Sequence, residues 1–132
     1  PFRTLGQALD DVRQLHRLLD AGQSRWMQAL GLDAGLLNRL PHEVSGGELQ
    51  RFALLRLMLL QPAFIFADEP TSRLDPITQR NTMRVLCETA ADQGCSVLLV
   101  SHDADLARTS SQRHVTIPGL SGQSERVTKM RA

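Results

Sequence analysis

Two adjacent carboxylates, Asp68 and Glu69, come directly after a short apolar run at residues 63–67 and could support metal or acid–base chemistry. Burying paired carboxylates is costly unless a cation or a proton offsets them. At the carboxyl end of a parallel strand, where such sheets bind ligands, Asp68 could hold Mg²⁺ and Glu69 could activate a water molecule. The alternative is an exposed turn in which Asp68 only caps the next segment. The apolar run before the carboxylates favours a strand that ends in a crevice.

The tetrapeptide Ser45-Gly46-Gly47-Glu48 is a second candidate site. A helix capping box would explain the serine and the glutamate, because each reaches the backbone amide of the other. It would not explain two adjacent glycines. Paired glycines let the backbone approach a ligand closely, and a helix N-terminus offers free amides and a positive dipole to an anion. Both interpretations stay open: a cap alone, or a phosphate site.

A third candidate is His102, in the tripeptide Ser101-His102-Asp103. A lone histidine at a strand end is more often structural than functional. The strand predicted at residues 96–100 would nevertheless lie beside the strand that precedes Asp68 and Glu69, so His102 could share their crevice.

The elements that must position these residues are predicted from apolar spacing and from helix and strand boundaries. The two short apolar runs are continuous, which is typical of strands buried on both faces. Asp75-Pro76 marks a helix start and Gly94 a helix end. The order of the elements along the chain implies a parallel α/β layer that follows an N-terminal group of helices. The expected elements are helices at 5–22, 24–30 (capped by Ser24), 34–39, 48–60, 76–93 and 103–108, strands at 63–67 and 96–100, an edge strand at 114–117, and a frayed end from Pro118.

Composition narrows the class of protein. The chain has 132 residues, 42% of them hydrophobic, and a net charge of +1, so no strong field recruits nucleic acid. No apolar run reaches the roughly 20 residues of a membrane span. Two cysteines form no disulfide framework. The cell interior is the expected location, and the start without an initiator methionine suggests a chain cut from something longer.

Taken together, four motifs resemble those of ABC-type ATPases. Residues 44–51 resemble the signature motif, 64–69 the Walker B motif with its catalytic glutamate, 72–75 (Ser-Arg-Leu-Asp) the D-loop, and 101–103 the H-loop. They occur in the family's order and spacing. The resemblance implies an α/β fold: a partial P-loop NTPase (ABC ATPase) core with parallel strands, preceded by an α-helical subdomain. The expected divisions are a helical subdomain at 1–45, the core at 46–119 and a flexible tail at 120–132.

The resemblance also implies a mechanism, in which two ATPase domains dimerise head to tail and enclose ATP and Mg²⁺ between them. Phosphoryl transfer then proceeds by positioning and electrostatics. The implied roles are nucleotide binding by Ser45, Gly46, Gly47, Glu48 and Asp75, binding of Mg²⁺ by Asp68, and catalysis by Glu69 as general base with His102 on the γ-phosphate.

One departure from the family pattern is large. A phosphate-binding P-loop needs Gly-x-x-x-x-Gly-Lys-Ser/Thr. The single lysine of this sequence is Lys129, and it does not lie in such a motif. We therefore expect the chain alone to bind ATP weakly and to hydrolyse it negligibly, while the intact protein, with further residues at its front, is the ATPase. The alternative is a non-catalytic half-domain that donates its signature motif to another subunit's ATP.

The amino-acid sequence in and around the motifs, at residues 47–51 and 67–76, looks most like that of the bacterial ATPases of oligopeptide, dipeptide and nickel importers. Another ABC transporter subunit is the runner-up. The resemblance implies as partners a second ABC ATPase domain and transmembrane permease subunits, without nucleic acid. It places the protein in the cytoplasm, on the inner face of the cell membrane.

Overall fold

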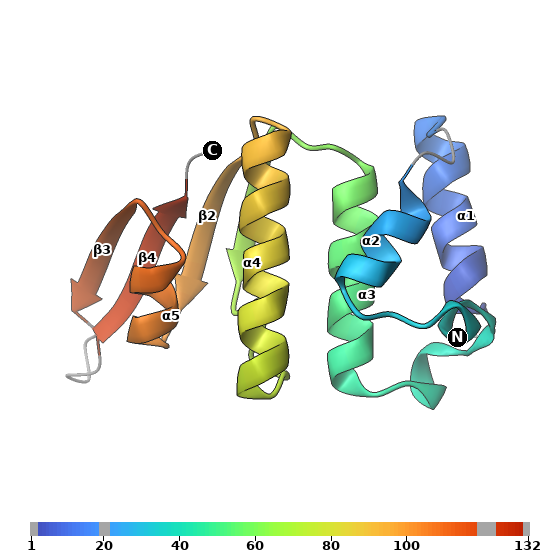
Figure 1. The fold of residues 1–132 in the computed structure, drawn as a ribbon, viewed down its shortest axis with the longest axis horizontal. Helices are drawn as coiled ribbons and strands as arrows, with labels where there is room; N and C mark the ends of the chain where they lie inside the picture. The colour runs from blue at the N-terminus through green and yellow to red at the C-terminus, as the bar shows by residue number, and fades with distance from the viewer. Residues whose placement is uncertain (1–2, 19–21, 119–123, 131–132) are drawn as a thin grey trace. The chain divides into compact units, whose positions relative to one another are not determined.

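The computed structural model describes residues 3–18, 22–118 and 124–130, and Figure 1 shows its fold. Contacts divide the chain into two compact units, Pro1–Gln61 and Pro62–Ala132. Within the described residues, no helix combines the length and the hydrophobicity that crossing a membrane requires. In chain order the elements are α1 (Leu5–His16), α2 (Gln23–Ala29), the 3-10 helices η1 (Ala34–Asn38) and η2 (Pro41–Glu43), α3 (Gly46–Leu59), β1 (Phe64–Asp68), α4 (Pro76–Asp92), β2 (Ser96–Ser101), α5 (Ala104–Thr109), β3 (Arg113–Pro118) and β4 (Ser124–Met130).

The first unit is helical, as its apolar spacing predicted, but two of its boundaries differ from expectation. Helix α1 ends at His16 and does not continue to residue 22, because Arg17 adopts a left-handed φ of 51° and closes the helix; residues 19–21 lie outside the described part. The predicted cap at Ser24 is also wrong. Helix α2 begins at Gln23 after Gly22, whose φ of 108° suits glycine and whose turn supplies no side-chain cap.

Helix α3 belongs to this first unit and begins with the expected capping box. It buries five apolar side chains, and α2 packs against it. The compact unit therefore ends at Gln61 and includes α3, whereas the sequence motifs suggested a division after residue 45. The five buried side chains of α3 are Phe52, Leu54, Leu55, Met58 and Leu59.

The second unit contains a four-stranded sheet in the order β1-β2-β4-β3. Strands β1 and β2 are parallel, as predicted, while β4 runs antiparallel to both of its neighbours. β3 lies at the sheet edge, as expected. β4 is a correction, because residues 124–130 form a strand where the sequence suggested a flexible tail; residues 120–123 and 131–132 lie outside the described part.

Helices α4 and α5 lie on the same side of this sheet (Figure 1). Beneath them, alternate strand residues such as Ile65, Val97 and Leu99 are buried. The opposite face of β1 is open, since the side chains of Phe64 and Phe66 are 55% and 60% exposed. The expectation that β1 is buried on both faces is therefore wrong. Among the described residues helices cover one face only, so burial follows the two-residue period of a strand.

Candidate functional site

The two parallel strands bring two of the predicted site residues together. In their register Asp68 of β1 lies opposite Val100 of β2, and the backbone N–H of Glu69 donates to the carbonyl of Val100 at 2.9 Å. Glu69 and His102 therefore come just after the carboxyl ends of adjacent strands, where parallel sheets place their ligands. The crevice that sequence spacing predicted at this edge is present.

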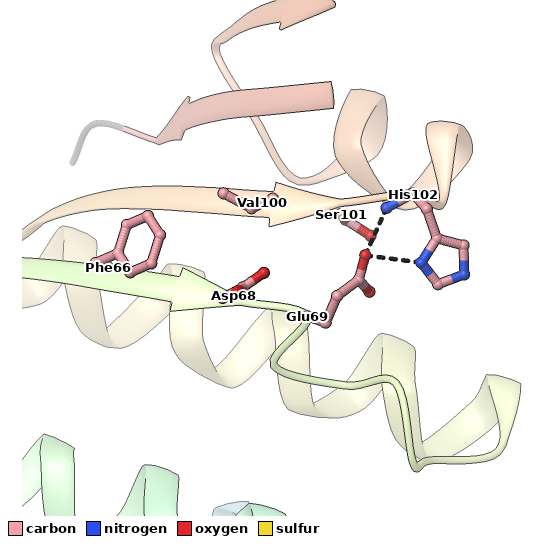
Figure 2. Close-up of a pocket in the computed structure, with 6 residues that line it drawn as sticks. All are labelled: Phe66, Asp68, Glu69, Val100, Ser101 and His102. Atoms are coloured by element: carbon pink, nitrogen blue, oxygen red, sulfur yellow. Dashed lines mark hydrogen bonds and ion pairs between the residues drawn. The ribbon is translucent and has the colours of Figure 1, made fainter. Parts of the chain in front are cut away.

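The carboxylate of Glu69 is held by His102 (Figure 2). Its Oε1 accepts the backbone N–H of His102 at 2.7 Å, and the imidazole Nδ1 of His102 lies 2.7 Å from the same oxygen. The side chain of Glu69 is 32% exposed and that of His102 is 77% exposed. Solvent and ligands can thus reach the pair, and the imidazole becomes a cationic partner of the carboxylate when it is protonated.

Glu69 also has an unusual backbone. Its φ of 46° lies in the left-handed region, which few residues other than glycine adopt. Such conformations persist where surrounding contacts determine them, and they occur often at functional sites. Here the contacts to Val100 and His102 supply that determination.

A cavity of about 370 Å³ opens beside this pair, and Figure 2 shows the side chains around it. Carboxylate oxygens are the ligands that Mg²⁺ takes from proteins, usually one or two of them together with phosphate oxygens and water. Among the described residues no cluster of three or more His, Cys, Asp or Glu could hold a metal by itself. Asp68 supplies one such carboxylate on the cavity wall, and its binding of Mg²⁺ stays a prediction. The cavity is lined by Phe66, Asp68, Glu69, Val100, Ser101 and His102.

The tetrapeptide that precedes α3 lies in the first unit and forms a complete capping box. The hydroxyl of Ser45 accepts the N–H of Glu48 at 3.2 Å, and Glu48 Oε2 accepts the N–H of Ser45 at 2.8 Å and its hydroxyl at 2.7 Å. The hydrogen bond from the backbone of Ser45, and then that from its side chain, lowers the pKa of Glu48. The structure thus forms the predicted cap, and phosphate binding by Gly46 and Gly47 stays a prediction.

Asp75 occupies the expected position at the start of α4, but it does not line the cavity. Its Oδ1 accepts the N–H groups of Ile77 at 3.0 Å and Thr78 at 3.1 Å, and Pro76 is the first helical residue after it. Hydrogen bonds from Thr78, first from its side chain and then from its backbone, lower the pKa of Asp75. Within this chain Asp75 is a helix cap.

Sequence reasoning missed two cavity residues, Phe66 and Val100. Both belong to runs whose composition predicts strands buried on both faces. The alternation of side chains along a strand could have predicted them. Phe66 and Val100 share the sheet face of Asp68 and so reach the same cavity.

The helical first unit, the parallel strand pair and the carboxylate–histidine pair at its end define an α/β protein with a polar crevice at the strand ends. A family model described as ABC transporter matches residues 6–72, and the chain belongs to the ABC transporter family. It spans about a third of the length of the curated relatives that it matches.

The relatives come from several kinds of transport system. The chain is 33% identical over 119 residues to the oligopeptide transport ATP-binding protein OppF of Salmonella typhimurium, covering 86% of this chain and 36% of that protein. It is 44% identical over 82 residues to the lipoprotein-releasing system ATP-binding protein LolD of Myxococcus xanthus, covering 60% and 37%. In structure it resembles the ATP-binding cassette MJ0796, solved as a dimer in a post-hydrolysis state with ADP and Pi, with a TM-score of 0.74, 27% identity, and coverage of 100% of this chain and 59% of that one.

Proposed function

We propose that this chain supplies the hydrolysis and closure part of an ATP-hydrolysing ABC transporter subunit, of the kind that powers bacterial peptide or nickel importers. One observation carries the proposal: Asp68, Glu69 and His102 line one cavity at the ends of two parallel strands. The OppF relatives support the importer assignment. The LolD relative keeps open another transported cargo.

Three of the cavity residues, Asp68, Glu69 and His102, have a chemical role in this proposal. Asp68, an exposed carboxylate on the cavity wall, would bind Mg²⁺, which neutralises phosphate charge in this class of reaction. Glu69 would accept the proton of the attacking water as general base. His102, whose Nδ1 contacts Glu69, would donate from Nε2 to a phosphate oxygen when its ring is protonated.

The first unit would act on a different nucleotide. In the proposed head-to-tail dimer, Ser45, Gly46, Gly47 and Glu48 face the ATP of a second ABC ATPase domain, where the amides at the start of α3 suit an anion. Asp75 would couple the two sites across the interface. The dimeric state of the MJ0796 structure supports such a partner. The proposal also includes transmembrane permease subunits and a position on the cytoplasmic face of the membrane.

A second candidate function rests on the signature motif at the capped start of α3 alone. The 132 residues include no P-loop motif, and their only lysine is Lys129. A chain with this sequence could serve purely as a dimer partner that donates its signature motif while another subunit hydrolyses ATP. By itself, either kind of chain is expected to turn over ATP negligibly.

Two mixtures separate these functions. The first combines the chain with an ABC ATPase domain that has an intact P-loop and a disabled signature motif. Turnover of Mg-ATP should return in this mixture, and Ser45→Arg should abolish it. The second mixture combines the chain with a P-loop-bearing fragment that lacks its own catalytic glutamate. Turnover should return there too, and Glu69→Gln should remove it, while Glu88→Gln, in a surface ion pair with Arg84, should not.

The outcomes distinguish the candidates. Rescue of the first mixture alone would favour the dimer partner over the enzyme. Rescue of neither would contradict both, and turnover by the unmixed chain would show that the phosphate is held by residues other than a P-loop lysine.

A further inference from the structure

His102 has an exposed side chain whose position depends on its backbone. The ring is 77% exposed, and its hydrogen-bonding contacts in the structure are with Glu69. A side chain with so little packing is directed by the φ and ψ angles of its own residue and of its neighbours. The residues that fix those angles flank it on both sides.

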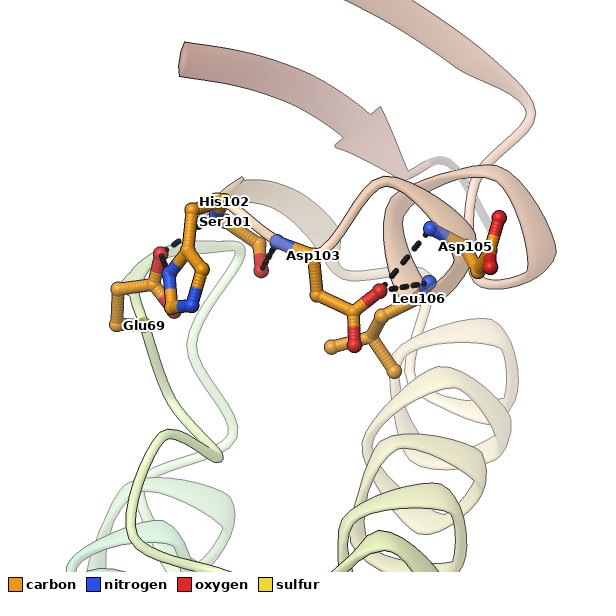
Figure 3. A network of polar contacts seen from close by, with 6 residues as sticks. All are labelled: Glu69, Ser101, His102, Asp103, Asp105 and Leu106. Atoms are coloured by element: carbon orange, nitrogen blue, oxygen red, sulfur yellow. Dashed lines mark hydrogen bonds and ion pairs between the residues drawn. The ribbon is translucent and has the colours of Figure 1, made fainter. Parts of the chain in front are cut away.

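On one side Ser101 ends β2 and is buried, with 2% of its surface exposed. On the other side Asp103 caps α5. Its Oδ1 accepts the N–H groups of Asp105 and Leu106, each at 3.0 Å, and Ser101 Oγ accepts the N–H of Asp103 at 3.1 Å (Figure 3). His102 therefore lies on a turn that is tied at both ends.

The helix that Asp103 caps is itself anchored. Leu106 and Ala107 are buried, and α5 packs against β2 and β4. The carbonyl of Asp103 accepts the N–H of Ala107 at 3.0 Å, so both the side chain and the backbone of Asp103 are attached to the first turn of α5. Movement of Asp103 would move the N–H of His102 away from Glu69.

We propose that Asp103 is a positioning residue for His102, acting with Ser101 through the turn that joins β2 to α5. This inference rests on the proposed function, in which His102 acts on phosphate. Asp103 does not line the cavity, and its side chain is hydrogen-bonded to the first turn of α5. Its effect on hydrolysis comes from holding His102 within hydrogen-bonding distance of the general base, where a displacement of about 1 Å can reduce a rate on the order of a hundredfold.

The test uses Asp103→Ala and the conservative variant Asp103→Asn, because an asparagine oxygen still accepts the two amide hydrogens of the cap. Long-range ¹H–¹⁵N NMR of the imidazole in the chain reports the contact between Nδ1 of His102 and Glu69. Turnover in the second mixture reports catalysis. Asp103→Ala should give His102 the ring nitrogen shifts of a free histidine and reduce turnover on the order of tenfold to a hundredfold. Asp103→Asn should restore both.

Asp33→Ala is a matched control, because Asp33 caps η1 through Gly35 in the first unit in the way that Asp103 caps α5. It should leave the His102 shifts unchanged. Ser101→Ala tests the same turn by removing the acceptor of the Asp103 N–H, and it keeps the inference testable if Asp103→Ala fails to fold.

Unchanged imidazole shifts in folded Asp103→Ala or Ser101→Ala would overturn the inference. A change in the His102 imidazole shifts of Asp103→Ala that Asp103→Asn fails to reverse would also overturn it. If Glu69→Gln leaves turnover intact, the proposed function fails instead, and the NMR result still decides whether Asp103 positions His102.

Discussion

One oxygen of Glu69 receives both polar groups of His102, since Oε1 lies 2.7 Å from the backbone nitrogen and 2.7 Å from Nδ1 of the ring. An ionised carboxylate accepts hydrogen bonds and cannot donate them. The ring must therefore carry a hydrogen on Nδ1 wherever this contact is formed. This leaves Nε2 as an acceptor in the neutral ring and as a donor in the protonated one.

This contact predicts the tautomer of His102. At neutral pH the imidazole of the wild-type chain should be in the Nδ1–H form, measurable by long-range ¹H–¹⁵N NMR. Glu69→Ala removes the acceptor and should shift the ring toward the mixture that free histidine shows. Glu88→Ala is the control, because Glu88 pairs with Arg84 on the surface of α4. An Nε2–H ring in the wild type would contradict the structure.

The cap of α3 predicts a loss of stability in Ser45→Ala. The variant removes the oxygen that accepts the N–H of Glu48, and losing such a cap costs about 1 kcal/mol. Urea unfolding should show this decrease. Ser24→Ala is the matched control, since α2 begins with no side-chain cap and the change lies within a few tenths of a kcal/mol of neutral. Equal effects of the two substitutions would show that the Ser45 cap adds nothing.

The pKa of Glu48 predicts how stability depends on pH. The folded protein holds this pKa below its ordinary value, so Glu48 stabilises the fold at neutral pH and loses that contribution as pH falls through the folded pKa. Glu48→Gln keeps the shape of the capping box but cannot titrate. Between pH 6 and roughly pH 3 the wild type should therefore lose more stability than Glu48→Gln. Parallel curves of unfolding free energy against pH would contradict this account.

The covered face of the sheet predicts a large cost for Leu99→Ala. Leu99 is fully buried on β2, and truncating such a leucine costs about 2–5 kcal/mol through lost burial and the cavity that remains. Ile77→Ala in the same unit is the control, because Ile77 is exposed at the start of α4 and its truncation should cost under about 0.5 kcal/mol. Thermal or urea unfolding measures both. A small decrease in the free energy of unfolding of Leu99→Ala would show that Leu99 is not part of the hydrophobic core.

Partial burial of Cys87 predicts slow thiol chemistry. Its pKa is raised to about 11 because burial disfavours the thiolate. In a Cys95→Ala background, alkylation of Cys87 at pH 8 should be about tenfold or more slower than that of a free cysteine, and it should accelerate as pH rises toward 11. Unfolding the chain in urea should remove the difference. Rapid labelling of the folded chain at pH 8 would show that the thiol is accessible and ionised.

Features set by neighbouring residues could be predicted from the sequence. Ser45 with Glu48 and Asp75 with Pro76 form their caps within three positions, so local chemistry determines them. The approach of Glu69 to His102 could be predicted from one assumption, that two apolar runs pair in parallel. The roles of these residues toward ATP stay predictions.

Features set by distant contacts were harder to predict. The pairing of β4 with β2 and β3 depends on partners far along the chain, and its seven residues are mostly polar. The end of α1 depended on Arg17 adopting a conformation that its residue type does not announce. The exposure of Phe66 depended on which face of the sheet the helices cover, which periodicity alone does not give.

The bare side of β1 should affect how the protein behaves in concentrated salt. Phe64 and Phe66 present aromatic surface to water on an edge strand whose outer backbone groups have no neighbouring strand in the described sheet. Salts that are excluded from protein surfaces, such as sulfate, strengthen the attraction between such surfaces. The chain should therefore salt out at lower ammonium sulfate concentrations than a Phe64→Ser, Phe66→Ser double variant. Low-sulfate buffers should therefore be the better choice for its NMR spectra.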